Sequence, residues 1–159
     1  MKNLILIIFT TLTFLGANAQ IFQGDVASHA GSNSYDQAIG LRLGFDLGAT
    51  YKVNLAGNSY AELLALFNDG DIKAAALYEL HYGISSGFNW YWGLGATAEI
   101  GGGFAIGATP VIGVEFNFGD FPFNASLDYM PTWRLIKINE EDNSFVGDNV
   151  ALSIRYVIN

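Results

Sequence analysis

The fold is decided by an alternation that begins in residues 37–45, QAIGLRLGF. Large apolar side chains occupy every second position from Ile39 to Phe45, whereas the positions between them hold only Ala, Gly and Arg42. Successive side chains of a β-strand point to opposite faces, so a period of two predicts a strand with one apolar face and one polar face. We therefore expect residues 37–45 to form an amphipathic strand.

The same alternation recurs to the end of the chain, between stretches of turn-forming residues. Asp69-Gly70 is a strong signal for a tight hairpin, because both residues tolerate a positive φ. Gly101-Gly102-Gly103 is also interpreted as a hairpin turn, since no Lys-Ser or Lys-Thr follows it as a phosphate-binding loop requires. The predicted strands are residues 37–45, 49–55, 60–67, 72–82, 90–100, 104–118, 122–133 and 150–158. This rhythm predicts an all-β fold, a single closed antiparallel up-and-down barrel of about eight strands.

The N-terminal residues have the features of a secretory signal. Lys2 supplies a positive start, residues 4–15 form an apolar run, and Ala17-Asn18-Ala19 matches the small-x-small pattern that signal peptidase cuts. We therefore assign residues 1–19 to a signal peptide for Sec export, residues 20–36 to a polar lead-in segment, and residues 37–159 to the barrel. The chain has no cysteine, which excludes a lipid-anchored lipoprotein, a disulfide and a thiolate metal site.

The composition restricts the partners and the environment. A net charge of −8 makes nucleic acid an unsuitable partner, so none is expected. Apolar residues make up 51% of the chain and charged residues 14%, yet no apolar run after the signal is long enough for a membrane helix. A bilayer that meets alternating strands would accommodate such a chain, so the predicted barrel is a transmembrane one.

Charged side chains recur on the polar parity of almost every predicted strand. The residues on this parity are Arg42, Lys52, Glu62, Lys73, Glu79, Glu99, Glu115, Asp128 and Arg155. A barrel of about eight strands is just wide enough for side chains to fill it. We predict that eight of these residues, all but Glu99, form a luminal charge network that fills a polar lumen, while the apolar parity meets lipid.

The aromatic residues are sorted toward the strand ends. If both chain ends are periplasmic, one aromatic girdle lies at the far ends of the strands and one at the near ends, with an aliphatic band between them. The far girdle is Phe45, Phe67, Phe104 and Trp133, and the near girdle is Tyr82, Trp90, Phe118, Phe123 and Tyr156. Aromatic side chains settle at the two interfaces of a bilayer, so this sorting favours a membrane barrel.

Three stretches carry a resemblance to a known family: SYDQAIGLRLG (34–44), WYWGLG (90–95) and GDNVALSIRY (147–156). They resemble the small eight-stranded outer-membrane β-barrel proteins of Gram-negative bacteria, and the chain is similar to the transmembrane domain of OmpA-like proteins without their periplasmic domain. The resemblance implies a location in the cell outer membrane, contact with outer-membrane lipid, and insertion by the barrel-assembly machinery, guided by the last strand. Such strands usually end on an aromatic residue, and this chain departs from the pattern by ending in YVIN (156–159).

The sequence leaves alternatives to a non-catalytic structural or surface-interaction role. The inward charges could line a narrow pore for water, ions or small solutes. A soluble, lipocalin-like ligand carrier would have the same strands with the opposite face inward. His81, with Ser85 and Ser86 close by, could suggest a lipid hydrolase, but no nucleophile-elbow motif surrounds the serines. We expect no enzyme and no cofactor, and interpret His81 as an interfacial residue near the periplasmic rim.

The longest predicted connection is residues 134–148. Outer-membrane barrels keep long connections outside the cell, so any extracellular partner is expected to bind this loop. Its oxygen-bearing residues Glu140, Glu141, Asp142, Asn143 and Asp148 lack the spacing of a known calcium loop, and we predict no metal site there.

Overall fold

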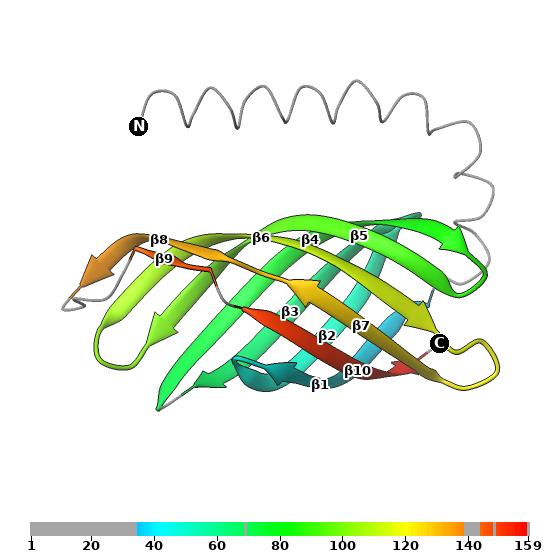
Figure 1. Ribbon diagram of the computed structural model, residues 1–159, viewed down its shortest axis with the longest axis horizontal. Helices are drawn as coiled ribbons and strands as arrows, with labels where there is room; N and C mark the ends of the chain where they lie inside the picture. The colour runs from blue at the N-terminus through cyan, green and yellow to red at the C-terminus, as the bar shows by residue number, and fades with distance from the viewer. Residues whose placement is uncertain (1–34, 69, 139–143, 148, 159) are drawn as a thin grey trace, which may run out of the picture.

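The computed structural model describes residues 35–68, 70–138, 144–147 and 149–158. The predicted signal peptide and residues 20–34 of the lead-in lie outside these ranges. The described chain is built from strands joined by turns (Figure 1). They are β1 (Gln37–Gly44), β2 (Leu47–Ala56), β3 (Ser59–Asn68), β4 (Asp71–Ser85), β5 (Phe88–Ile100), β6 (Phe104–Asn117), β7 (Phe123–Tyr129), β8 (Thr132–Ile138), β9 (Phe145–Val146) and β10 (Val150–Ile158). In these ranges no helix has the length and apolar character that a membrane span requires.

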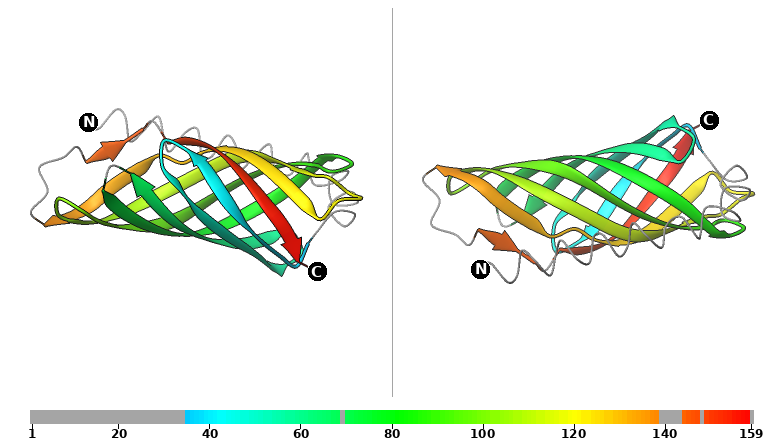
Figure 2. Two further views of the ribbon diagram at one scale, coloured as in Figure 1. Left: turned by 90° about the horizontal axis from the view of Figure 1, so that it is seen from below. Right: turned by 90° about the horizontal axis from the view of Figure 1, so that it is seen from above.

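The sheet closes on itself through its first and last strands. β1 pairs antiparallel with β2 on one side and with β10 on the other, where Gln37 lies opposite Ile158 and Gly44 lies opposite Ala151. β7 and β8 both pair with β6, so they are two halves of one wall strand, and β9 and β10 likewise pair with β8 and β7. The wall therefore has eight strand positions, which confirms the predicted closed antiparallel barrel. Figure 2 shows that the strands run obliquely to the long axis of the barrel.

The predicted strand 122–133 is interrupted at Met130-Pro131 and then continues to Ile138. Proline has no backbone N–H to donate to a ladder. Pro110 on β6 and Pro131 on the facing wall strand lie between the β6–β7 and β6–β8 pairings, so the ladder is interrupted there. The hydroxyl of Thr109 donates a hydrogen bond of 2.8 Å to the carbonyl of Pro131 and so satisfies it. The ladder is thus interrupted without leaving this carbonyl unpaired.

The loop predicted at residues 134–148 is in part strand, so that prediction was wrong at its two ends. Residues 134–138 belong to β8 and pair with the beginning of β6, and residues 145–146 form β9. The long β6 pairs with residues 134–138 beyond Trp133, and this pairing outweighs the polar character of these residues. Trp133 consequently lies at the start of β8 and not at the far end of its strand. Residues 139–143 and 148, which include the proposed oxygen ligands, lie outside the described ranges.

The turns define two ends of the barrel. The near end holds Tyr35, Ile158 and the turns around residues 57–58, 86–87 and 118–122, and the far end holds the turns at 45–46, around Gly70 and at 101–103. In Figure 1 the near end is on the right and the far end on the left. Gly70 adopts a φ of 96°, the left-handed conformation that the predicted Asp69-Gly70 hairpin signal requires, although Asp69 itself is not described.

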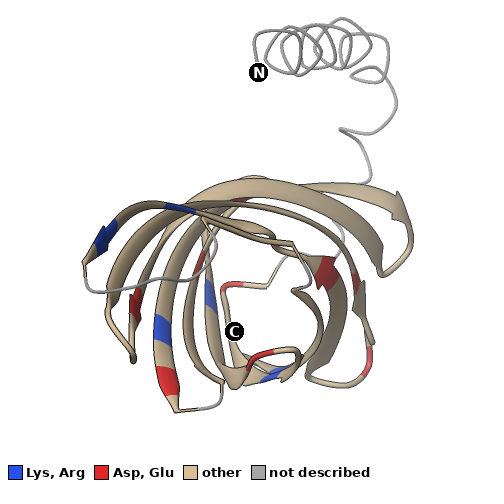
Figure 3. Ribbon diagram, turned by 60° about the vertical axis from the view of Figure 1, so that its left-hand side comes forward, with Lys and Arg blue, Asp and Glu red and all other residues tan. Residues whose placement is uncertain are grey.

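The outer face of the barrel is apolar and its inner face carries the charges. Leu41 is 62% exposed, whereas the next residue, Arg42, is 1% exposed. The same contrast holds on the other strands, where the outward side chains are large and apolar and the buried ones include Lys52, Glu62 and Arg155. Figure 3 shows acidic and basic positions on several strands around the wall. The charged side chains of the wall are therefore buried in the lumen, and many of the large apolar side chains are exposed on the outside.

Candidate functional site

The near half of the lumen holds a buried ionic network centred on Lys52 and Arg155. The Lys52 ammonium lies 2.7 Å from a carboxylate oxygen of Glu79, 3.5 Å from Glu62 and 3.6 Å from Glu115. The guanidinium of Arg155 contacts Glu62 at 2.5 Å and Glu115 at 3.7 Å. Each of these residues points inward from a different strand, because each lies on the polar parity of its strand. Burial makes this network rigid, since each charge depends on its neighbours for compensation.

Arg42 and Asp128 form a separate bidentate pair beside this network. The two guanidinium nitrogens of Arg42 lie 2.8 and 2.5 Å from the two oxygens of Asp128, the geometry in which Arg binds carboxylates most specifically. The Tyr91 hydroxyl donates a third hydrogen bond of 3.0 Å to Asp128. Gly113 provides the space for this arrangement, because a Cβ there would lie 2.7 Å from Cζ of Tyr91.

Aromatic rings close the near end beneath the charges. Tyr35, just before β1, is buried against Tyr60 with ring centroids 5.2 Å apart, and Tyr60 lies 4.4 Å from the His81 ring. The Tyr35 hydroxyl donates a hydrogen bond of 3.0 Å to Glu115. Burial, and then the nearby Glu115 carboxylate, holds the pKa of Tyr35 well above its ordinary value, so the hydroxyl keeps its proton for this bond.

His81 belongs to this cap and is separated from the serines near it in sequence. Its ring stacks on Tyr91 at 4.7 Å with an interplanar angle of 6°, and its Nε2 is 2.9 Å from Glu79. Ser85 and Ser86 are exposed at the near-end turn, whereas His81 is buried. The structure therefore places His81 near the rim, as predicted, but inside the lumen, where it contacts carboxylates and aromatic rings.

A layer of apolar side chains crosses the middle of the lumen, and the sequence analysis did not anticipate it. We call it the apolar layer, and its residues are Leu64, Leu66, Ala75, Leu77, Tyr91, Val111 and Met130. They come from β3, β4, β5, β6 and the β7–β8 junction and are buried against one another. The predicted polar lumen is thus polar in its two halves and apolar between them. On β3 both parities are apolar from Leu63 to Leu66, so alternation alone gave no signal for these positions.

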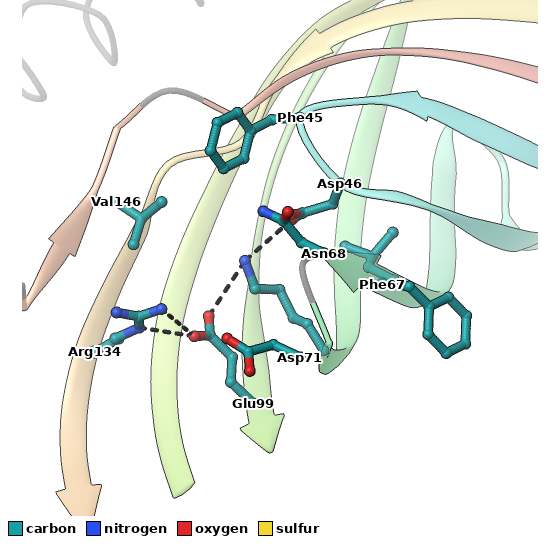
Figure 4. A pocket seen from close by; sticks show the side chains of 10 residues that line it. Phe45, Asp46, Phe67, Asn68, Asp71, Glu99, Arg134 and Val146 are labelled. Carbon is teal, nitrogen blue, oxygen red and sulfur yellow. Dashed lines mark hydrogen bonds and ion pairs between the residues drawn. The ribbon is translucent and has the colours of Figure 1, made fainter. Parts of the chain in front are cut away.

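A second ionic cluster lies at the far end. Lys73 contacts Asp46 at 3.1 Å and Glu99 at 3.3 Å, and Arg134 contacts Glu99 at 2.6 Å. These side chains line a recess of about 70 Å³, together with Phe45, Phe67 and Val146. Figure 4 shows Asp46, Glu99 and Arg134 on its wall. The eight residues predicted to form one network therefore divide into the five around Lys52 and Arg155, the Arg42–Asp128 pair, and Lys73, which stands apart at the far end. Asp46 and Arg134, which join Lys73 and Glu99 in the far-end cluster, were not predicted. Glu99 was recognisable by its parity.

The predicted aromatic girdles lie on the outer face near the two ends, with one exception. Near the near end, Tyr82 stacks on Trp90 at 4.9 Å and Phe123 meets Tyr156 edge-on at 5.5 Å, while Phe118 is exposed in the turn after β6. Phe45, Phe67 and Phe104 adjoin the far-end turns. The exception is Trp133, which packs against Phe145 at 5.1 Å five residues before its strand ends.

The chemistry available to the lumen is that of mutually compensated charges. Within the described ranges, no group of three or more histidine and acidic side chains is arranged to hold a metal ion. Lys52 and Arg155 already contact the carboxylates around them. No protein-family model, no curated protein and no solved structure matches this chain.

Proposed function

We propose that this chain is an integral outer-membrane β-barrel protein with a non-catalytic role in envelope structure or surface interaction. The observation that carries the proposal is the distribution of side chains across the wall. Large apolar residues such as Leu41, Leu94 and Leu135 are exposed on the outside, while Arg42, Lys52 and Arg155 are buried inside. A continuous apolar outer surface is unfavourable in water and favourable in lipid, since soluble monomers seldom expose large apolar patches.

The dimensions of the wall support the same proposal. A tilted strand needs about 9–11 residues to cross a bilayer. β2 and β3 have 10 residues each, and β4, β5 and β6 have 15, 13 and 14. Every backbone group in lipid must be paired, and a closed sheet supplies this pairing, because it has no free edge. The near end would face the periplasm and the far end the cell exterior.

The packing of the lumen favours a filled barrel over a carrier or a pore. A lipocalin-like carrier would place its apolar parity around an internal ligand, whereas here the inner face holds paired charges and the apolar layer. A pore would need a continuous polar path, and the apolar layer lies across it. We assign the surface role to the far end, where residues 134–138 and the recess lie, and insertion to the barrel-assembly machinery.

The proposal of a non-catalytic role rests on the surroundings of His81. A serine nucleophile that is activated by a histidine must lie within hydrogen-bond reach of it. His81 is instead held by Glu79 and by the rings of Tyr60 and Tyr91, away from the exposed serines.

The test is fractionation of cells that make the full chain, followed by gel electrophoresis with and without boiling. We expect the protein in the outer-membrane fraction, resistant to extraction by urea at alkaline pH, with a mobility that changes only after boiling. The control is the same chain denatured before it is mixed with membranes, which urea should extract. Recovery in the soluble periplasmic fraction with no mobility shift would contradict the proposal and favour a carrier.

A further inference from the structure

The apolar layer separates two ionic compartments of the lumen. Along β4 the inward side chains are, from the far end, Lys73, Ala75, Leu77 and Glu79. Lys73 belongs to the far-end cluster and Glu79 to the near-end network, so the apolar pair lies between them. On β3, counted from the near end, the inward Glu62 is likewise followed by the apolar Leu64 and Leu66. Two neighbouring strands therefore place the layer at the same depth.

The layer is closely packed. Leu66 and Met130 are fully buried, and Leu64, Leu77 and Val111 are nearly so. Beside it, on β10, Ala151 is also buried. Small apolar spaces in proteins stay dry, because water finds no hydrogen-bond partners in them. The two ionic compartments are thus divided by side chains that cannot hold a file of water molecules.

We infer that the apolar layer, and not the ion pairs, is the barrier that keeps water and ions from crossing the barrel. This inference rests on the proposed membrane location. An ion that crosses must lose its hydration, and the one polar side-chain atom of the layer, the Tyr91 hydroxyl, already donates its proton to Asp128. The ionic clusters present charged oxygen and nitrogen atoms that can contact a passing ion in place of its lost water, so they resist its passage less. The two charged halves therefore position the barrel's strands, and the layer seals it.

The competing barrier is the far-end ionic cluster. Lys73 bridges Asp46 on the β1–β2 turn and Glu99 on β5, and so reaches across the mouth of the lumen (Figure 4). If this bridge were the barrier, Lys73→Met would open the barrel. If the apolar layer is the barrier, Lys73→Met leaves the barrel closed, because the layer beneath it is intact.

The deciding experiment records single-channel current through the purified full chain in planar lipid bilayers. We expect no conductance steps from the wild type or from Lys73→Met, and discrete steps from the double variant Leu66→Ser/Leu77→Ser. Serine is chosen because it both removes volume and supplies hydroxyls, whereas an alanine cavity would stay dry. The matched control is Leu63→Ser/Leu80→Ser, the same change on the same two strands at outward positions, which should remain silent.

Folding of each variant is checked by the boiling-dependent mobility shift. Conductance by the folded wild type or by Lys73→Met would overturn the inference, and so would a folded Leu66→Ser/Leu77→Ser variant that stays silent. If the double variant does not fold, the same measurement on Val111→Ser and on Met130→Ser decides the question. A wild type that fails to enter membranes at all would refute the proposed function instead, before any current is recorded.

Discussion

The guanidinium of Arg155 holds several strands to one another across the lumen. It contacts Glu62 and Glu115 and donates hydrogen bonds to Thr50 at 3.0 Å and Ser126 at 2.9 Å, all of them buried. Removal of one partner of a buried ion pair leaves the other charge uncompensated. We expect Arg155→Ala to lower the free energy of unfolding by about 3–5 kcal/mol. Urea titration of the protein in lipid vesicles, followed by tryptophan fluorescence, measures this loss.

The control for Arg155→Ala is Lys137→Ala, which removes an exposed cation from the far end of β8. Substitutions at exposed positions usually change stability by less than about 0.5 kcal/mol. An Arg155→Ala variant as stable as Lys137→Ala would show that the luminal charges do not depend on one another.

The close approach of Tyr91 to β6 depends on the absence of a Cβ at Gly113. A Cβ at position 113 would lie 2.7 Å from both Cζ of Tyr91 and Cβ of Asp128, so Gly113→Ala forces the ring or the strand to move. Overpacking of this kind costs about 1–3 kcal/mol. Gly102→Ala is the matched control, because a Cβ there meets nothing within 4 Å. The same urea titration should separate the two variants, and equal midpoints would refute the proposed contact.

At the scale of the elements, the Thr109 hydroxyl pairs the carbonyl of Pro131 at the break between β7 and β8 and also accepts a hydrogen bond of 3.5 Å from Thr132. Thr109→Val keeps the shape of the side chain and removes the donor to the carbonyl of Pro131. A buried carbonyl left without a partner costs about 1–3 kcal/mol. The control is Thr97→Val on β5, because the equally buried Thr97 hydroxyl has no hydrogen-bond partner in the described ranges. We expect Thr109→Val alone to lower the unfolding midpoint, and a larger loss in Thr97→Val would contradict this account.

The strands were predictable from the sequence to the extent that alternation and turn residues marked them. Asp69-Gly70 fixed a hairpin, and the parity of Arg42 and Arg155 placed both side chains inward. Residues 134–138 were not recognisable as strand, because their pairing partner on β6 is determined by the register of the whole wall. Register also explains why Lys73 is separated from the other predicted network residues. Which inward charges meet depends on the stagger between strands, and alternation carries no information about stagger.

At the scale of the whole molecule, the proposed bilayer makes the cost of a charge depend on its depth. Leu94 lies midway along β5, and Ile84 lies beside the near-end turn, and both are exposed on the outer face. In lipid, Leu94→Arg should cost about 2–4 kcal/mol, whereas Ile84→Arg should cost about 0–1 kcal/mol, because arginine near the interface reaches water. Urea titration in vesicles compares the two variants. Similar small losses at both positions would indicate an outer face in contact with water.

The pairing of β1 with β10 has a consequence for how the chain must be made. β1 finds its second partner only in β10, so the sheet cannot close before β10 has been synthesised. Until then the chain carries two unpaired strand edges and an exposed apolar face, the features that lead β-sheets to aggregate. Closure also joins residues at opposite ends of the chain, a slow step in folding. Such a chain depends on being held unfolded, by a chaperone or by its delivery route, until its last strand is available.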